Sequence, residues 1–445
     1  MLGAQRGTLT NLISTSGGAQ QDWSAHYRLY GRHGVEERHL FALARDELVQ
    51  SLAPGQPLVV FVDDTLVRKS GRHITGTGWK RDPLGPAFQT NLVLGQRYLQ
   101  LSAAWPHGQG QAQSVPIDFV HAPSAAALPR QATPAQRQAR REQQKQRNLN
   151  TYALQSLQHL RHSLGEARPI LLCGDGSYTN KAILRQLPKG THYLGRTRKD
   201  AVLHHLPERG AKTKGGRPAS YGARAPSPEE LRQDEGRPWK KVRAHAAGKE
   251  HEFELKELGP VLWRKSGARR PLRLIVINAL GYRPRAGAKL QYRAPAHLLS
   301  TDLDSPLEAL VQHYLWRWGI EVNFRDEKQL LKVGQAQVRS AASNQHQPAS
   351  VVAAYSLLLV SALKEHAAGR ISTTVQPPKW RRRVKCPQQA GRLPSTGELQ
   401  RQLRYEAWSE AIRPESLSRF INGGDAHTKW QKPPSSLPGM LFHAA

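Results

Sequence analysis

Three acidic residues occupy positions where a carboxylate could bind a metal ion. Asp63 ends the apolar run 58–62, Asp175 follows the apolar run 170–173, and Glu321 lies in a segment with helical spacing. A charge beside a buried strand costs free energy unless it is paired or bound to a metal, and carboxylate oxygens favour Mg²⁺ or Mn²⁺. Because a single strand-end aspartate is often only a turn or helix cap, the prediction depends on all three acids. Together they predict phosphoryl transfer with two metal ions about 4 Å apart.

The helical segment around Glu321 adds side chains that could hold a phosphate group. At about 100° per residue, one narrow face carries Tyr314, Arg317, Glu321 and Lys328. An adjoining apolar stripe carries Trp316, Ile320, Phe324 and Leu331. The plain interpretation is a solvated face with an ion pair between Arg317 and Glu321. A tyrosine and two cations beside a metal-bound carboxylate would also grip a DNA phosphate next to the bond that is cut.

This pattern resembles a known family. The spacing Tyr-(2)-Arg-(3)-Glu-(6)-Lys is similar to the signature of bacterial insertion-sequence transposases of the DDE superfamily. The segment Asp63-Asp64-Thr65 resembles the first-aspartate motif of that family, and Gly174-Asp175-Gly176 resembles the second. The resemblance covers roughly residues 55–340. It implies a ribonuclease H-like catalytic core, with a mixed sheet flanked by helices.

The resemblance also implies roles for individual residues. Asp63, Asp175 and Glu321 would hold two Mg²⁺ ions, with Mn²⁺ as a possible substitute. The side chains that would contact the terminal phosphates of the transposon end are Tyr314, Arg317 and Lys328. These roles, and the partners that follow from them, are expectations at this stage.

Alternative acids lie close to two of these positions. Strand alternation allows only one of Asp63 and Asp64 to face the site, and the Asp-x-Thr spacing favours Asp63. Asp326 and Glu327 share the helix of Glu321, but helical spacing turns both away from its active face. We therefore expect Asp63 and Glu321 to be the ligands.

The long separation of Asp175 from Glu321 predicts an insertion in the core. Glycines, basic residues and short apolar pieces fill residues 196–300, and family members of this branch carry a β-rich insertion there. In such relatives an aromatic residue of the insertion can stack on a flipped base. Trp263 is the first candidate and Trp239 the second, although a tryptophan buried in the insertion core is the more common outcome.

The elements that must position these residues alternate between strand and helix. We expect strands at 58–62 and 170–173, and two strands at 91–94 and 98–104 joined by a tight turn at Gly95-Gln96. Residues 133–164 are polar and basic, then amphipathic, and helical spacing returns at 306–333 and 348–364. The fold class is therefore α/β, with helical N-terminal and C-terminal regions.

Five regions follow from this pattern. Residues 1–52 form a helical region for DNA end binding or a packing cap, 53–195 the first part of the core, 196–300 the insertion, 301–370 the second part of the core, and 371–445 a basic region for DNA contact or dimerisation. Basic clusters at 137–147 and 379–383 are further candidates for phosphate contact.

The composition predicts a polyanionic partner. The 445 residues include 65 Lys and Arg against 34 Asp and Glu, a net charge of +31. Nucleic acid is the usual partner for such an excess, ahead of a membrane surface or an acidic protein. Cys173 and Cys386 have no paired spacing, which argues against a zinc knuckle or a disulfide framework and fits a reducing cytoplasm. No secretory leader opens the chain, and the apolar run 351–363 predicts a buried helix because it is too short to span a bilayer.

The leading interpretation is a DNA transposase that cuts transposon ends and transfers them to target DNA. Its expected partner is double-stranded DNA, a homodimer is expected because paired-end cutting needs two protomers, and no membrane is expected. The expected location is the bacterial cytoplasm, at the nucleoid. The alternatives are a ribonuclease H-like nuclease without strand transfer and a domesticated DNA-binding protein.

Overall fold

The computed structural model describes most of the chain between residues 3 and 411. The described stretches leave out residues 208–218, 372–392 and 412–445, and short gaps at 4–5, 17, 19–21, 32–33, 83–84, 87, 109, 268, 284 and 286. The basic cluster 379–383 and Cys386 therefore lie outside the described residues.

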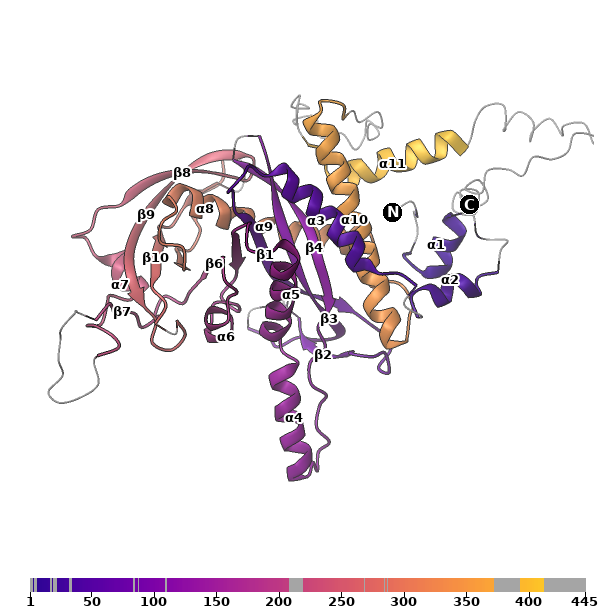
Figure 1. Cartoon of the computed structure of the whole chain (residues 1–445), viewed down its shortest axis with the longest axis horizontal. Coiled ribbons are helices and arrows are strands. Elements are labelled where there is room, and N and C mark those ends of the chain that lie inside the picture. Colours follow the sequence, from indigo (N-terminus) through magenta and orange to yellow (C-terminus); the bar gives the residue numbers. More distant parts are fainter. Residues whose placement is uncertain are drawn as a thin grey trace, which may run out of the picture.

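A large mixed sheet forms the centre of the molecule (Figure 1). Its main path runs in the order β2-β3-β1-β5-β6-β13-β10-β9-β7, with β4 paired to β3 and β8 paired to β9. The strands are β1 Leu58–Arg68, β2 Gly78–Arg81, β3 Leu92–His107, β4 Gln111–His121, β5 Ile170–Gly174, β6 Thr191–Arg196, β7 His204–His205, β8 Lys240–Ala246, β9 Lys249–Leu262, β10 Leu272–Ile277 and β13 Ala296–Ser300. A small separate pair consists of β11 Gly281–Tyr282 and β12 Gln291–Tyr292. The architecture is mixed α/β and compatible with a ribonuclease H-like core.

Several helices cover the two faces of this sheet. The helices of the described residues are α1 Leu9–Thr15, α2 Ser24–Leu29, α3 Glu37–Ser51, α4 Pro134–Gln146, α5 Leu149–Leu164, α6 Lys181–Arg185, α7 Pro228–Gln233, α8 Leu307–Trp316, α9 Trp318–Gln329, α10 Ala341–Ala367 and α11 Thr396–Ala411. Leu58, Val60 and Val62 of β1 share a core with α3, α5 and α10. Val59 and Phe61 share a second core with α8 and α9. Alternation along β1 therefore decides which helices each side chain meets.

The region 196–300 contributes strands to the same sheet as the core. β13 pairs with β6, and β10 joins β13 to β9. A third group of buried apolar side chains, including Leu231, Val261 and Leu274, fills the space beside these strands. The strands of the insertion therefore extend the core sheet.

The prediction of a tight turn at Gly95-Gln96 is wrong. β3 runs without interruption through both residues and pairs with β1 on one side and β2 on the other. A side chain at Gly95 would lie 2.7 Å from the carbonyl oxygen of Val67. The glycine therefore allows a close approach of two strands rather than a change of direction.

Two of the segments described from the sequence each contain two helices. The stretch 133–164, polar and basic and then amphipathic, consists of α4 and α5, because Asn148 caps the start of α5 with its side chain. The stretch 306–333 divides into α8 and α9 at Arg317. The third helix begins earlier than expected, since Ser340 caps α10 and Pro348 lies inside it.

Two helices at the boundaries of the expected regions belong to the core. The α3 residues Phe41, Ala44 and Leu48 are buried, and α3 packs against α10 and β4. Helix α10 is the one helix among the described residues that is long and apolar enough to cross a membrane, yet 61% of its most apolar window is buried inside the protein. This burial matches the buried helix expected from 351–363.

Candidate active site

The two aspartates meet because their strands are parallel neighbours. In the pairing of β1 with β5, Val62 lies opposite Gly174. Asp63 and Asp175 are the next residues along the two strands, so they lie side by side where β5 ends. Asp63 does not end its strand as expected, because β1 continues to Arg68 while paired with β3. The negative charge of Asp175 raises the pKa of the Asp63 carboxyl group, which agrees with this placement.

The Asp63 side chain is held in a largely buried position, where it is 19% exposed. Burial is the main reason that the pKa of Asp63 is raised to about 7. The backbone N–H of Asp64 donates a hydrogen bond of 2.8 Å to Asp63 Oδ1, and it lowers the pKa together with Arg317. The ionised form of Asp63 is therefore disfavoured mainly by burial, with a smaller contribution from the charges of Asp175 and Asp64.

Arg317 joins Asp63 to Glu321. Its two terminal nitrogens lie 3.4 Å from Asp63 Oδ2 and 3.0 Å from Glu321 Oε1. The guanidinium lies at the junction of α8 and α9, with its carbon 5.8 Å from the centre of the Tyr314 ring. The Arg317 side chain is 12% exposed, and its Nε has no hydrogen-bond partner among the described residues. A single cation thus pairs with two of the three predicted carboxylates.

Asp64 faces the opposite side of β1. Its carboxylate lies 3.3 Å from Arg97 Nε and accepts a hydrogen bond of 3.3 Å from the Tyr178 hydroxyl. Burial raises the pKa of Asp64, and the positive charges of Arg97 and Lys328 lower it. The alternation of β1 thus turns Asp63, rather than Asp64, toward Glu321.

Lys328 does not join the other predicted residues of its helical face. Its charge acts on Glu327 and Asp64, and its ammonium lies 6.0 Å from the centre of the Phe324 ring. Glu321 and Lys328 both lie on α9, seven positions apart, which corresponds to about 10 Å along the helix. The structure therefore brings together Tyr314, Arg317 and Glu321, and places Lys328 beside Asp64.

The loop after β5 is shaped by its own hydrogen bonds. The Ser177 N–H donates to Asp175 Oδ1 at 2.8 Å, and the Thr179 hydroxyl donates to the Asp175 carbonyl at 3.0 Å. Gly174 leaves room for the Tyr193 hydroxyl, since a Cβ atom at position 174 would lie 2.7 Å from that hydroxyl oxygen. These contacts fix the Asp175 carboxylate at the strand end.

The donor set is suited to a divalent cation, although the side chains are arranged around an arginine. Among the described residues, no three His, Cys, Asp or Glu side chains are gathered closely enough to hold a metal ion as they stand. The charges of Asp175 and Asp64 contribute to the raised pKa of Asp63, and a bound cation would offset this repulsion. Anionic oxygens from Asp63, Asp175 and Glu321 fit hard cations such as Mg²⁺.

Helical spacing turned Glu327 away from this site, but the sequence analysis did not predict that Glu327 is buried. Glu327 is 1% exposed, and burial raises its pKa to about 8. The Gln100 side chain next to it lowers the pKa, and Gln100 is the residue that pairs with Asp63 across β1 and β3. Ile320, Asn323 and Glu327 recur at the spacing of a buried helical face. That spacing was the signal that Glu327 points into the core.

The expected aromatic residues of the insertion are held by packing. Trp263 is partly buried against two groups of core side chains. Trp239 packs against the group that includes Leu258 and Val261, and the Lys256 ammonium lies 4.4 Å from the centre of its ring. Stacking of Trp263 on a base therefore stays a prediction.

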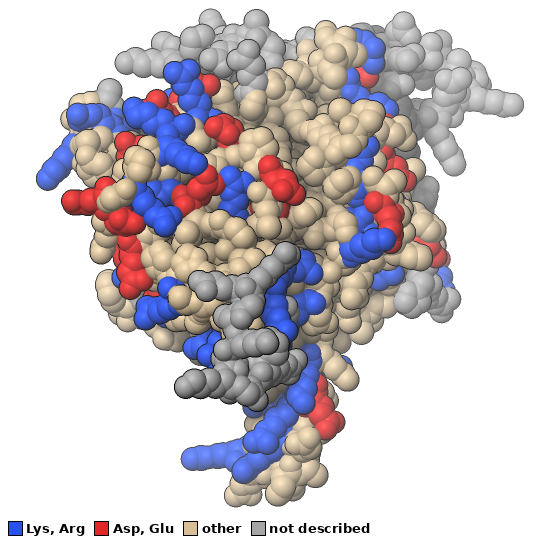
Figure 2. Space-filling model, turned by 60° about the vertical axis from the view of Figure 1, so that its left-hand side comes forward, with Lys and Arg blue, Asp and Glu red and all other residues tan. Residues whose placement is uncertain are grey.

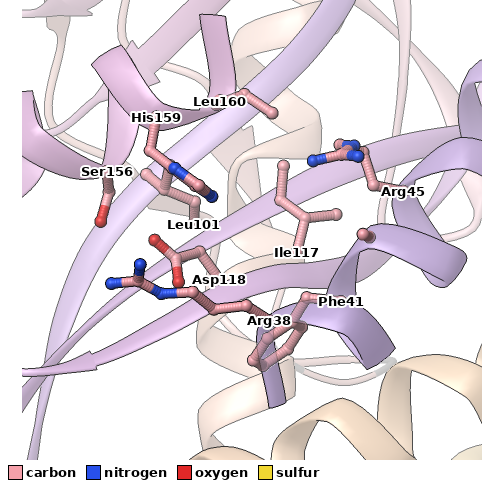
Figure 3. A pocket seen from close by; sticks show the side chains of 10 residues that line it. Arg38, Phe41, Arg45, Leu101, Ile117, Asp118, Ser156, His159 and Leu160 are labelled. Atoms are coloured by element: carbon pink, nitrogen blue, oxygen red, sulfur yellow. The ribbon is translucent and has the colours of Figure 1, made fainter. Parts of the chain in front are cut away.

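A separate hollow lies on the other face of the sheet, between α3, α5 and β4 (Figure 3). Asp118 points into it, where burial raises the pKa of its carboxyl group. The side chain of Ser156 and the charges of Arg38 and His159 lower that pKa. These contacts tie two helices to the sheet, and we assign them a structural role.

Comparison with known proteins assigns the family. The model of the DDE superfamily endonuclease family matches residues 1–270, more than half of the chain. The chain therefore belongs to this family, and its class is that of DNA-cleaving endonucleases. No curated protein matches it significantly. The matched part contains Asp63 and Asp175 but ends before Glu321, so the position of Glu321 rests on the geometry described above.

Proposed function

We propose that this endonuclease is a DNA transposase that cuts the ends of a bacterial insertion sequence and joins them to target DNA. The observation that carries the proposal is the meeting of Asp63 and Glu321 around Arg317, with Asp175 beside Asp63. The proposal is supported by an arginine that Asp63 and Glu321 share, and by Asp175 following the strand next to that of Asp63.

In this proposal Asp63, Asp175 and Glu321 hold two Mg²⁺ ions, or Mn²⁺ in their place. When bound, the metal ions supply activation of the attacking oxygen and stabilisation of the leaving oxygen. The Arg317 guanidinium, beside Asp63 and Glu321, would donate hydrogen bonds to a DNA phosphate and orient it, with the Tyr314 side chain beside it.

Other parts of the chain take supporting roles in the proposal. Lys328 and Trp263 would contact the DNA end, and the N-terminal region 1–52 would recognise its sequence. The basic region 371–445 would contact DNA or a second protomer, since paired-end cutting needs a homodimer. The enzyme would act in the bacterial cytoplasm, at the nucleoid.

The test is the variant Asp175→Ala, assayed for Mg²⁺-dependent nicking of DNA that carries the ends of the element. We expect nicking to be lost while binding of the same DNA is nearly unchanged, because the carboxylate acts on the reaction rather than on affinity. The matched control is Asp200→Ala, since Asp200 is an exposed acid paired with Arg198. Full nicking by Asp175→Ala would exclude this site.

A second assay separates a transposase from a nuclease without strand transfer. DNA ends that are already cut, with free 3′-hydroxyl groups, are supplied together with a target plasmid. A transposase joins them, and Asp175→Ala does not. Nicking of intact DNA without any joined product would favour the nuclease, and metal-independent binding without nicking would favour a domesticated DNA-binding protein.

A further inference from the structure

Helix α4 projects from the body of the protein (Figure 1). None of its 13 residues is buried, so no packed face holds it in place. A helix of this length is marginal in water without packing. Its start is fixed locally, by a capping box between Thr133 and Gln136 and by Pro134 in the first turn. The capping residues and the proline of the first turn thus favour a helix that is exposed and does not contribute to the core.

One side of α4 is basic and free of ion pairs. Arg137, Arg141 and Lys145 recur every four residues, and Arg140 lies next to them on the helix. The single acid of α4, Glu142, is engaged by Gln138 at 2.9 Å. Among the described residues the four cations make no ion pair, and the Nε of Arg140, a half-buried residue, has no hydrogen-bond partner. Figure 2 shows Lys and Arg side chains along one side of this projection.

The base of α4 adjoins the candidate active site. Asn148 ends the α4 segment and caps α5. Two residues later, Asn150 accepts a hydrogen bond of 2.9 Å from the side-chain amide of Asn180. Asn180 closes the loop that begins at Asp175 and caps α6. The projection therefore leaves the molecule near the loop that follows β5 and carries Asp175.

We infer that α4 is an arm whose basic face binds the phosphate backbone of the DNA duplex beside the cleavage site. The inference rests on DNA as the substrate of the proposed function. A helix of 13 residues spans about 20 Å, which corresponds to roughly six base pairs of duplex. The arm thus adds contacts outside the active site, where they fix the duplex without reading its sequence.

The chemistry of α4 favours DNA over other polyanions and over a second copy of the chain. A helix that binds a membrane surface needs an apolar face, and α4 contains only alanine and one proline among its non-polar residues. Two copies of this arm facing each other would bring like charges together, which is unfavourable. A regularly spaced row of cations instead matches the regular phosphates of a duplex.

The test compares two triple variants that lose the same charge. The arm variant is Arg137→Gln, Arg141→Gln and Lys145→Gln. The control variant is Lys189→Gln, Arg198→Gln and Arg370→Gln, in which each cation is exposed and already paired with a carboxylate. Glutamine retains helix propensity, and an unchanged melting temperature verifies that each variant is folded.

Affinity for a labelled duplex of about 30 base pairs is measured without metal, from about 50 to 200 mM salt. Each lost phosphate contact reduces the slope of log K against log salt by about 0.9, so the arm variant should lose about 2 to 3 in slope. Its affinity should fall about tenfold or more, while the control loses less than about 1 in slope. A further variant with Arg137→Lys and Arg141→Lys keeps the charge and should keep the wild-type slope.

Equal losses in the arm and control variants would overturn the inference, because net charge alone would then explain them. An unchanged slope in the arm variant, or a changed oligomeric state without a changed slope, would overturn it as well. This readout is binding without metal, so it does not depend on nicking. If the arm variant has a reduced slope but the wild-type protein does not nick DNA, the proposed function is refuted. The inference that α4 binds DNA then still holds.

Discussion

Glu327 carries a carboxyl group into the interior, beneath the residues that are proposed to act on DNA. Its Oε1 has no hydrogen-bond partner among the described residues, and burial raises its pKa to about 8. The folded protein therefore holds a proton at Glu327 under conditions where the unfolded chain, with an ordinary carboxyl pKa, has released it. Between the ordinary carboxyl pKa and the pKa of about 8 in the folded protein, each increase in pH therefore lowers the free energy of unfolding.

We predict that Glu327→Gln removes part of the pH dependence of stability. For wild-type protein, the contribution of Glu327 to the free energy of unfolding falls as pH rises from about 4.5 to about 8. The variant lacks this contribution, so it should be more stable than wild type at pH 8 by a few kcal/mol, and the difference should vanish at pH 4. Urea unfolding across this range measures it. Glu308→Gln, an exposed site on α8, is the control, and an equal gain there would contradict the explanation.

The connection between α9 and α10 shows how elements hold the site. Gly334 has a φ of 85°, and its carbonyl accepts a hydrogen bond of 2.8 Å from the Lys69 ammonium. A side chain at Gly334 would lie 2.0 Å from a methyl carbon of Val67 on β1. The turn after the helix of Glu321 thus lies directly on the strand of Asp63. Packing at this turn sets the distance between the two elements.

We predict that Gly334→Ala lowers both stability and nicking. A left-handed backbone costs a residue with a side chain about 1 to 2 kcal/mol, and the contact with Val67 adds about 1 to 3 kcal/mol. Gly369→Ala is the matched control, because Gly369 has a φ of 67° and open space around it. Both variants should lose stability in urea unfolding and activity in the nicking assay, and both losses should be clearly larger for Gly334→Ala. Equal losses would mean that the close approach to β1 has no effect.

At the scale of the whole molecule, positive charge is the dominant property. The net charge is +31, and many surface acids are already paired with Lys or Arg, as Glu252 is with Lys241 and Asp200 with Arg198. Figure 2 shows basic side chains both on the main body and on the projecting arm. The Lys and Arg residues in excess over the acids favour a polyanionic partner. DNA is such a partner, since DDE endonucleases act on DNA.

We predict a steep salt dependence of binding to duplex DNA of any sequence. Between about 50 and 200 mM salt, affinity should fall by roughly a hundredfold or more, because several phosphate contacts release counterions. The Asp175→Ala variant should show the same slope, since its carboxylate is not proposed to contact phosphate. A nearly flat salt dependence, measured by fluorescence anisotropy, would contradict electrostatic binding of the backbone.

Local pattern in the sequence was enough to place several elements and the residues on them. The apolar runs before Asp63 and Asp175 predicted strands that the structure contains as β1 and β5, although β1 continues past the predicted end at residue 62 to Arg68. The apolar run 351–363 predicted a buried helix, and α10 is that helix. Such features depend on the spacing of hydrophobic residues and on the residues that end each apolar run. Both are properties of neighbouring residues in the chain.

Other features depend on partners that are distant in the sequence, and only the tertiary structure decided them. The pairing of β3 on both edges made Gly95 a strand residue, and the packing of α9 on the sheet buried Glu327. The break at Arg317 let its guanidinium reach both Asp63 and Glu321, while Lys328 came to lie beside Asp64. The sequence by itself determined which residues could carry out the chemistry. Strand register and helix packing determined which of them meet, because both are set by contacts across the fold.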